Sequence, residues 1–207
     1  MGKANQPPGY NLGFLPYEWL KPVFSLLMAV CFLAAFPAYG LQSNEALAIF
    51  NLIDKRLGYM KDVAAYKARN HSPVEDLQRE WAVIKSSREQ AERLGLDPDS
   101  IEHFFEAQIS AAKAIQYRYR ADWLSSPLPA DYKPADLITV IRPALMELGN
   151  DLLISIKQFL KRGYSFSPTQ EKLFVKTIAT ARLSQADKVK LYRGLSEIKL
   201  TGVDKKG

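Results

Sequence analysis

Apolar side chains recur every three or four residues through most of this chain, and this spacing constrains the fold more than any other feature. In the first such segment, residues 44–69, the apolar positions are Leu47, Phe50, Ile53, Leu57, Met60 and Ala64. The spacing places them along one face of a helix. No segment shows a convincing alternation of apolar and polar residues, so we predict an all-α protein.

Capping residues mark the ends of the first two predicted helices. Ser43 is a candidate N-cap for the first helix. The run Ser72-Pro73-Val74-Glu75 has the pattern of a capping box with proline at the first helical position, and it predicts that the second helix starts there. Gly95 follows Leu94 and provides the left-handed residue that commonly ends a helix.

The same signals divide the second half of the chain. Asp97-Pro98 predicts the start of a third helix, and a proline-rich link follows at residues 125–134. A fourth helix starts near Arg142, the run Ser167-Pro168-Thr169-Gln170 caps a fifth, and a sixth covers residues 184–199. We therefore expect a single-domain bundle of about six amphipathic helices over residues 41–207.

Residues 1–40 have the character of an export signal. They contain a 14-residue apolar run, residues 23–36, directly after Lys21 and Pro22, and small residues stand at the −3 and −1 positions of a possible cleavage site after Gly40. Residues 22–44 are also just long enough to span a bilayer. We favour cleavage and export to the periplasm or medium. The alternative is an uncleaved anchor, which is the one case in which we expect the protein to contact a membrane.

Several function classes have little support in the composition. The net charge is +6, but no aromatic–basic interleaving accompanies it, so we expect no nucleic acid partner. The single cysteine, Cys31, lies inside the apolar run, so a cleaved protein has no catalytic thiol and no disulfide. His71 and His103 are not spaced as a ligand pair, and we expect no metal.

Five charged residues stand at helical spacing in two neighbouring segments. Arg56 and Lys67 are eleven residues apart, a rotation of about 1,100° that returns to within about 20° of one helix face. Asp76, Arg79 and Glu80 follow at i, i+3 and i+4, again on one face.

Two interpretations of these charges remain open. Met60, Val63 and Ala64 share the sector of the two cations, and a cation within an apolar stripe requires a partner or a ligand. One interpretation is an internal ion-pair network that joins Arg56 or Lys67 to Asp76 or Glu80. The other is a pocket for a small molecule with two carboxylates and a hydroxyl.

These residues also fit a family pattern. It is carried by LIDKRL at residues 52–57, Val63-Ala64 with Lys67, PVEDLQRE at 73–80, GLDP at 95–98 and FFEAQISAAKAIQ at 104–116. Together they resemble the all-helical class of chorismate mutase over about residues 44–160. The longer chain and the leading apolar segment resemble the secreted, double-length subclass of that family.

The resemblance implies an isomerase that rearranges chorismate to prephenate without a cofactor. It implies that Lys67 and Gln116 donate hydrogen bonds to the ether oxygen that separates in the reaction. It also implies that Arg56 and Arg79 hold substrate carboxylates. In the secreted subclass an arginine from the second half of the same chain completes the site, and Arg142 is the candidate.

The resemblance assigns the ring hydroxyl to Glu80, with the backbone near Asp76. Ala112 departs from short family members that carry a hydroxyl at this position. The expected assembly is a homodimer with a complete site in each chain. The alternatives are a non-catalytic exported helical module that binds a small dicarboxylate or a protein partner, and a membrane-tethered bundle with an internal salt-bridge network.

Overall fold

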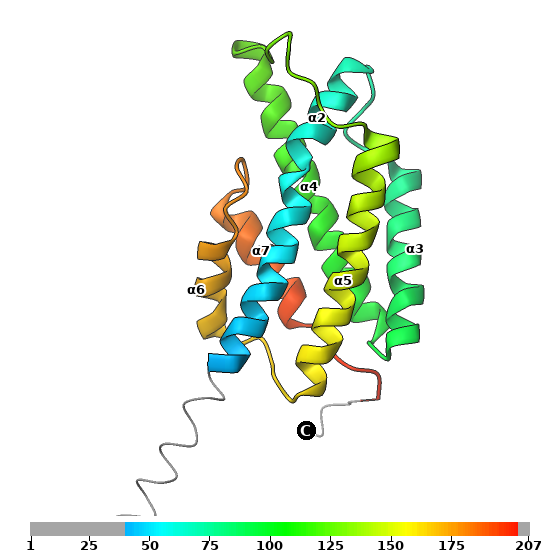
Figure 1. The fold of residues 1–207 in the computed structure, drawn as a ribbon, viewed down its shortest axis with the longest axis vertical. Coiled ribbons are helices and arrows are strands. Elements are labelled where there is room, and N and C mark those ends of the chain that lie inside the picture. Colours follow the sequence, from blue (N-terminus) through cyan, green and yellow to red (C-terminus); the bar gives the residue numbers. More distant parts are fainter. Residues whose placement is uncertain (1–39, 203–207) are drawn as a thin grey trace, which may run out of the picture. The chain divides into compact units, whose positions relative to one another are not determined.

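The computed structural model describes residues 40–202, shown in colour in Figure 1. These residues form helices and short links, and their one β feature is an isolated bridge between Leu96 and Leu200. The all-α prediction is therefore confirmed. The apolar run at residues 23–36, with Cys31 inside it, lies outside the described residues. Within the described part, no helix combines the length and the apolar character that crossing a membrane requires.

The described helices follow one another with short connections. Residues 40–58 are helical, and then come α2 (Met60–Arg69), α3 (Leu77–Leu94), α4 (Pro98–Ser125), the π-helical turn η2 (Leu137–Ile141), α5 (Arg142–Lys161), α6 (Pro168–Thr177) and α7 (Gln185–Ser196). A single non-helical residue, Tyr59, separates the first two. The prediction that Ser43 is the N-cap of the first helix is wrong, because residues 40–43 are already helical.

The start of α3 differs from the prediction and matters for the site. The run Ser72–Glu75 is not helical, and the N-cap is Asp76, whose carboxylate accepts the backbone N–H of Arg79 at 3.1 Å. Glu80 in turn accepts the backbone N–H of Asp76 at 3.3 Å. Val74 is buried and its carbonyl accepts from Lys67, so this residue serves the core and the pocket instead of a first helical turn. The predicted stop at Gly95 is confirmed, with φ of 73°.

The remaining helix starts agree with their capping signals. Asp97 accepts the backbone N–H of Ser100 at 2.8 Å at the start of α4. Ser167 precedes α6 and Ser184 precedes α7, each in a capping box. The fourth predicted helix does start at Arg142, but the π-helical turn leads directly into it and is itself capped by Asp136. The last helix ends at Ser196, three residues before the predicted end.

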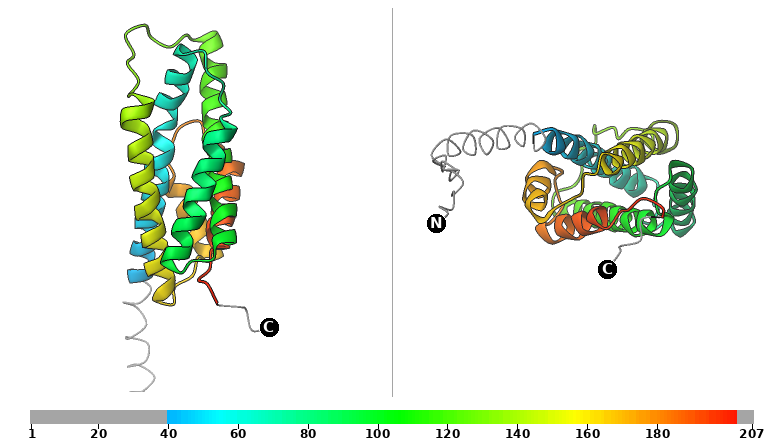
Figure 2. Two further views of the ribbon diagram at one scale, coloured as in Figure 1. Left: turned by 90° about the vertical axis from the view of Figure 1, so that its right-hand side faces the viewer. Right: turned by 90° about the horizontal axis from the view of Figure 1, so that it is seen from below.

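Helix α4 lies at the centre of the helical unit. It contacts α2, α3 and α7, while α5 packs against α3 and the π-helical turn contacts α2. Figures 1 and 2 show α2, α3, α4 and α5 running side by side, with α6 beside the helix at residues 40–58 and α7 beside α4. The arrangement brings parts of five helices, those at residues 40–58 and α2 to α5, to one cavity.

A cluster of aromatic rings joins the early helices to the late ones. Phe50 is fully buried, and its ring meets that of Phe174 on α6 edge-on at 5.1 Å between centroids. It also contacts Tyr192 on α7 and Phe166 in the link before α6. The late helices therefore complete the core that the early helices begin.

We expect Phe50→Ala to reduce the free energy of unfolding by about 3–5 kcal/mol, because it removes a buried ring and leaves a cavity between three elements. Chemical denaturation monitored by circular dichroism measures the change. The control is Leu124→Ala, at a side chain that is 87% exposed, for which we expect a change within about 0.5 kcal/mol. Equal losses in the two variants would contradict this account of the core.

Candidate functional site

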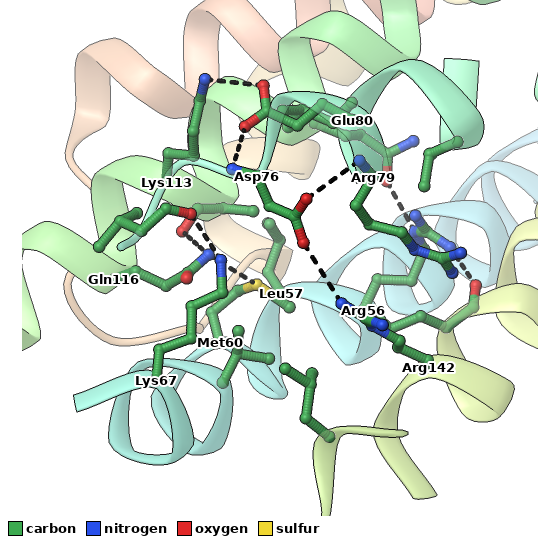
Figure 3. A pocket seen from close by; sticks show the side chains of 18 residues that line it. Arg56, Leu57, Met60, Lys67, Asp76, Arg79, Glu80, Lys113, Gln116 and Arg142 are labelled. Carbon is green, nitrogen blue, oxygen red and sulfur yellow. Dashed lines mark hydrogen bonds and ion pairs between the residues drawn. The ribbon is translucent and has the colours of Figure 1, made fainter. Parts of the chain in front are cut away.

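One cavity of about 160 Å³ collects the charges that the sequence singles out (Figure 3). All seven predicted site residues line it: Arg56, Lys67, Asp76, Arg79, Glu80, Gln116 and Arg142. They come from the helix at residues 40–58, from α2, α4 and α5, and from the capped start of α3. Apolar side chains including Leu57, Met60 and Val83 form the rest of the wall.

Arg56 is a largely buried cation held by neutral partners. Its Nε donates to Oε1 of Gln108 at 2.9 Å, and its Nη1 donates to the carbonyl of Leu145 at 2.5 Å. Its guanidinium also lies 5.5 Å from the ring centroid of Phe105. Burial lowers the pKa of Arg56 from 12.5 to about 10. These contacts fix the guanidinium without neutralising it, so the site favours an anion next to it.

Lys67 is the second cation buried in the cavity, with 9% of its surface exposed. Its Nζ donates to the carbonyl of Val74 at 2.5 Å, which leaves two further donors on the ammonium group. Burial lowers the pKa of Lys67, and the carboxylates of Asp76 and Glu80 oppose that change without reversing it. The ammonium group is therefore partly desolvated, which strengthens its interaction with negative charge.

The two carboxylates of the cavity pair with other cations. Asp76 Oδ2 lies 3.3 Å from Nη2 of Arg142, and Glu80 Oε2 lies 2.9 Å from Nζ of Lys113. Within residues 40–202 neither carboxylate forms a salt bridge with Arg56 or Lys67, so the ion-pair network considered from the sequence is not the one that forms. Glu80 accepts hydrogen bonds from Lys113 and from the Asp76 backbone, and this fixes its carboxylate at the edge of the cavity.

Two glutamines from α4 bring amide groups to the cavity with unused hydrogen-bonding capacity. Gln116 is buried, and its Nε2 donates to the carbonyl of Ala112 at 3.1 Å and contacts Sδ of Met60 at 3.7 Å. In the described part of the chain, Oε1 of Gln116 and Nε2 of Gln108 are buried without a hydrogen-bond partner. Buried polar atoms are nearly always satisfied, so these two atoms point to a polar ligand or to water in the cavity.

The charge balance indicates the kind of ligand that the cavity suits. Its lining residues include five cations, Arg56, Lys67, Arg79, Lys113 and Arg142, against the two carboxylates of Asp76 and Glu80. A small dianion with an apolar body complements both this net charge and the apolar part of the wall. The resulting site has donors for carboxylates on one side and an acceptor, Glu80, on the other.

Sequence reasoning missed two of the polar lining residues, Gln108 and Lys113. Gln108 stands at i, i+4 and i+8 with Ala112 and Gln116, so helical spacing on α4 could have indicated it. Lys113 offered no comparable signal, because its partner Glu80 is on α3 and only the packing of α3 against α4 brings the two together.

We expect Arg79→Met to raise the thermal unfolding midpoint of the ligand-free protein by roughly 2–4 °C, which corresponds to about 1 kcal/mol. Arg79 shares the cavity with the other cations and stands in the first turn of α3, where the helix dipole disfavours positive charge. Differential scanning calorimetry measures the change. Arg93→Met in the last turn of the same helix is the control and should give no increase, because a cation is favoured there. A lower midpoint for Arg79→Met would mean that its charge stabilises the unliganded fold.

Comparison with known proteins gives a consistent result. The family model described as chorismate mutase type II matches residues 47–117, a span that includes six of the seven predicted site residues and excludes Arg142. A relative from Yersinia pestis named secreted chorismate mutase is 41% identical over 181 residues, which is 87% of this chain and 95% of the relative. A monofunctional chorismate mutase from Enterobacter agglomerans is 40% identical over 73% of this chain and 82% of its own length.

Solved structures agree with the sequence relatives. The crystal structure of the secreted chorismate mutase from Yersinia pestis superposes with a TM-score of 0.68 at 44% identity, covering 74% of this chain and 97% of that one. The chorismate mutase from Burkholderia thailandensis gives a TM-score of 0.61 at 27% identity, covering 74% of this chain and 98% of its own.

Proposed function

The chain belongs to the chorismate mutase type II family, and we propose that the cavity described above is the site at which it rearranges chorismate to prephenate. The enzyme is an isomerase of the chorismate mutase class. The observation that carries the assignment of the site is Arg56, whose largely buried guanidinium is oriented by Gln108 and Leu145 and forms no salt bridge with a carboxylate of residues 40–202. A substrate carboxylate is the partner that this arrangement suits.

The reaction explains why fixed charges suffice as catalytic groups. Chorismate carries two carboxylates, a ring hydroxyl and an enolpyruvyl ether, and in one concerted step its ether C–O bond breaks while a C–C bond forms within the same molecule. An acceleration of about 10⁶ requires roughly 8 kcal/mol. Two effects can provide it: holding the flexible substrate in its compact reactive conformer, and stabilising negative charge as it develops on the ether oxygen.

The arginines are proposed to hold the compact conformer. Arg56 and Arg79 bind substrate carboxylates, for which a planar guanidinium fork is well shaped. Arg142 reaches the same cavity from α5 and is already oriented toward it by Asp76. Two carboxylates fixed at separate points restrict the rotation of the enolpyruvyl group, and this brings the two reacting carbon atoms together.

Lys67 and Gln116 are proposed to act on the ether oxygen. Lys67 has donors to spare beyond Val74, and its partial desolvation strengthens its effect on developing negative charge. The amide nitrogen of Gln116 donates to the carbonyl of Ala112 and also contacts the thioether of Met60. A thioether is a weak acceptor, and a substrate oxygen can replace it. Both donors are in place before the reaction, so little reorganisation is required.

Glu80 is proposed to accept the hydrogen bond of the ring hydroxyl. Lys113 and the backbone N–H of Asp76 hold its carboxylate in position. Ala112 offers no hydroxyl, so the contact that short family members make from this position is absent here. Lys113 is close enough to Glu80 to contribute a cation to this part of the cavity instead.

Export and assembly are also part of the proposal. The relatives named secreted chorismate mutase support export of this chain, which fits the apolar run and cleavage after Gly40. We propose that the mature enzyme is periplasmic or secreted and forms a homodimer. The origin of all seven predicted site residues from one chain supports a complete site in each subunit.

The direct test is a chorismate mutase assay on residues 41–207, in which loss of chorismate absorbance reports turnover. We expect Lys67→Ala to lose on the order of 10²–10³-fold in kcat, by analogy with removing an oxyanion donor, while its thermal midpoint stays near that of the parent. Lys55→Ala is the control, because Lys55 is exposed on the helix that carries Arg56. A folded Lys67→Ala variant with full activity would remove Lys67 from the mechanism. Ligand-induced stabilisation of the parent without turnover would indicate a binding module.

A second test uses pH to identify the group next to the reacting oxygen. A neutral amide donates at any ordinary pH, so the parent should have a broad kcat/KM profile through neutrality. A glutamate at this position donates only when protonated, and its ionised form repels developing negative charge. We therefore expect Gln116→Glu to lose activity as pH rises and to recover part of it in acid. Identical profiles for the two proteins would place Gln116 away from the ether oxygen.

A further inference from the structure

Gly149 stands in the interior of α5 directly against the guanidinium of Arg56. It is buried, and a Cβ atom added to it would lie 3.0 Å from Nη1 of Arg56. Glycine is disfavoured in the interior of a helix relative to alanine. Its φ is not in the left-handed region, so backbone conformation does not require glycine here. The close approach of Arg56 is the feature that distinguishes this position.

The approach follows from the hydrogen bond that fixes Arg56. Its Nη1 donates to the carbonyl of Leu145, which is one helical turn before Gly149 on the same helix. The guanidinium therefore lies along the surface of α5 from residue 145 to residue 149. A side chain at residue 149 would occupy the space next to the atom that makes this bond.

A second cavity gives the guanidinium room to move. It has a volume of about 130 Å³, and both Arg56 and Gly149 line it, together with Ser87, Asn150 and Leu153. Arg56 also lines the first cavity, so its guanidinium lies where the two cavities adjoin. An added Cβ would thus displace the flexible end of Arg56, and the helix backbone would stay where it is.

We propose that Gly149 is a positioning residue for the mutase reaction, and that its missing side chain lets Arg56 lie against α5 in the orientation that receives a substrate carboxylate. The inference rests on the proposed role of Arg56. Gly149 would act through Arg56 without contacting the substrate. It lies on α5, 93 residues after Arg56 along the chain.

The test is Gly149→Ala. We expect kcat/KM to fall by about 10-fold, because displacements near 1 Å can cost 10²-fold and this one is smaller. KM should account for most of the loss, since Arg56 is proposed to hold the substrate before reaction as well as during it. The thermal midpoint should stay the same or rise, because alanine favours the helix.

The matched control is Gly58→Ala. Gly58 is exposed and helical, and a Cβ atom added to it has no neighbour within 4 Å. It tests the same chemical change in a helix without a nearby cation. Its kinetic constants should equal those of the parent, while unchanged kinetics for Gly149→Ala itself would overturn the inference.

A double-mutant cycle with Arg56→Lys separates positioning from a general structural effect. A lysine at residue 56 lacks the guanidinium that the added Cβ displaces, so Gly149→Ala should cause little further loss in the Arg56→Lys background. If Gly149→Ala lowers the thermal midpoint instead, Arg56→Lys should restore it. Equal losses in both backgrounds, or a midpoint that is not restored, would overturn the role of Gly149. Full activity of Arg56→Lys alone would contradict the proposed function of the site instead.

Discussion

The buried guanidinium of Arg56 is the constraint around which the site is organised. Burying a cation without a counter-ion opposes folding. Among residues 40–202 the partners of this guanidinium are an amide oxygen, a backbone carbonyl and an aromatic face. Desolvation by burial lowers the pKa of Arg56 to about 10. A buried charge of this kind favours a negatively charged ligand beside it. A substrate carboxylate is proposed to provide the missing negative charge. An Arg56 that is favourable for binding would then lower the stability of the ligand-free protein.

Local structure around the cavity serves the site as well as the fold. Asp76 caps α3 with one carboxylate oxygen and pairs with Arg142 through the other, so the start of one helix orients an arginine from another. The π-helical turn before α5, capped by Asp136, leads directly into Arg142. The shift of the α3 start from the predicted Ser72 to Asp76 therefore affects the site directly. It leaves Val74 in an irregular segment where its carbonyl can receive Lys67.

The sequence predicted the helices and the charged lining well, because both follow from local spacing. The apolar period, the cap at Asp97 and the stop at Gly95 depend on neighbouring residues only. The predicted start of α3 was wrong because the capping pattern at Ser72 overlaps a second one at Asp76. Burial of Val74 favours the second. The pairing of Glu80 with Lys113 could not be predicted, since it depends on how α3 packs against α4. The contact between Gly149 and Arg56 is of the same kind, because nothing near either residue in the sequence indicates the other.

The choice of amides near the proposed reacting oxygen follows from the same electrostatics. A carboxylate beside Lys67 would form an ion pair, and the ammonium group would then have less capacity to stabilise new negative charge. Gln116 can donate without adding charge, and Gln108 orients Arg56 without neutralising it. The two carboxylates of the cavity, Asp76 and Glu80, are instead paired with Arg142 and Lys113. Within residues 40–202, Arg56 and Lys67 therefore form no salt bridge, and their positive charge stands where the substrate is proposed to carry or develop negative charge.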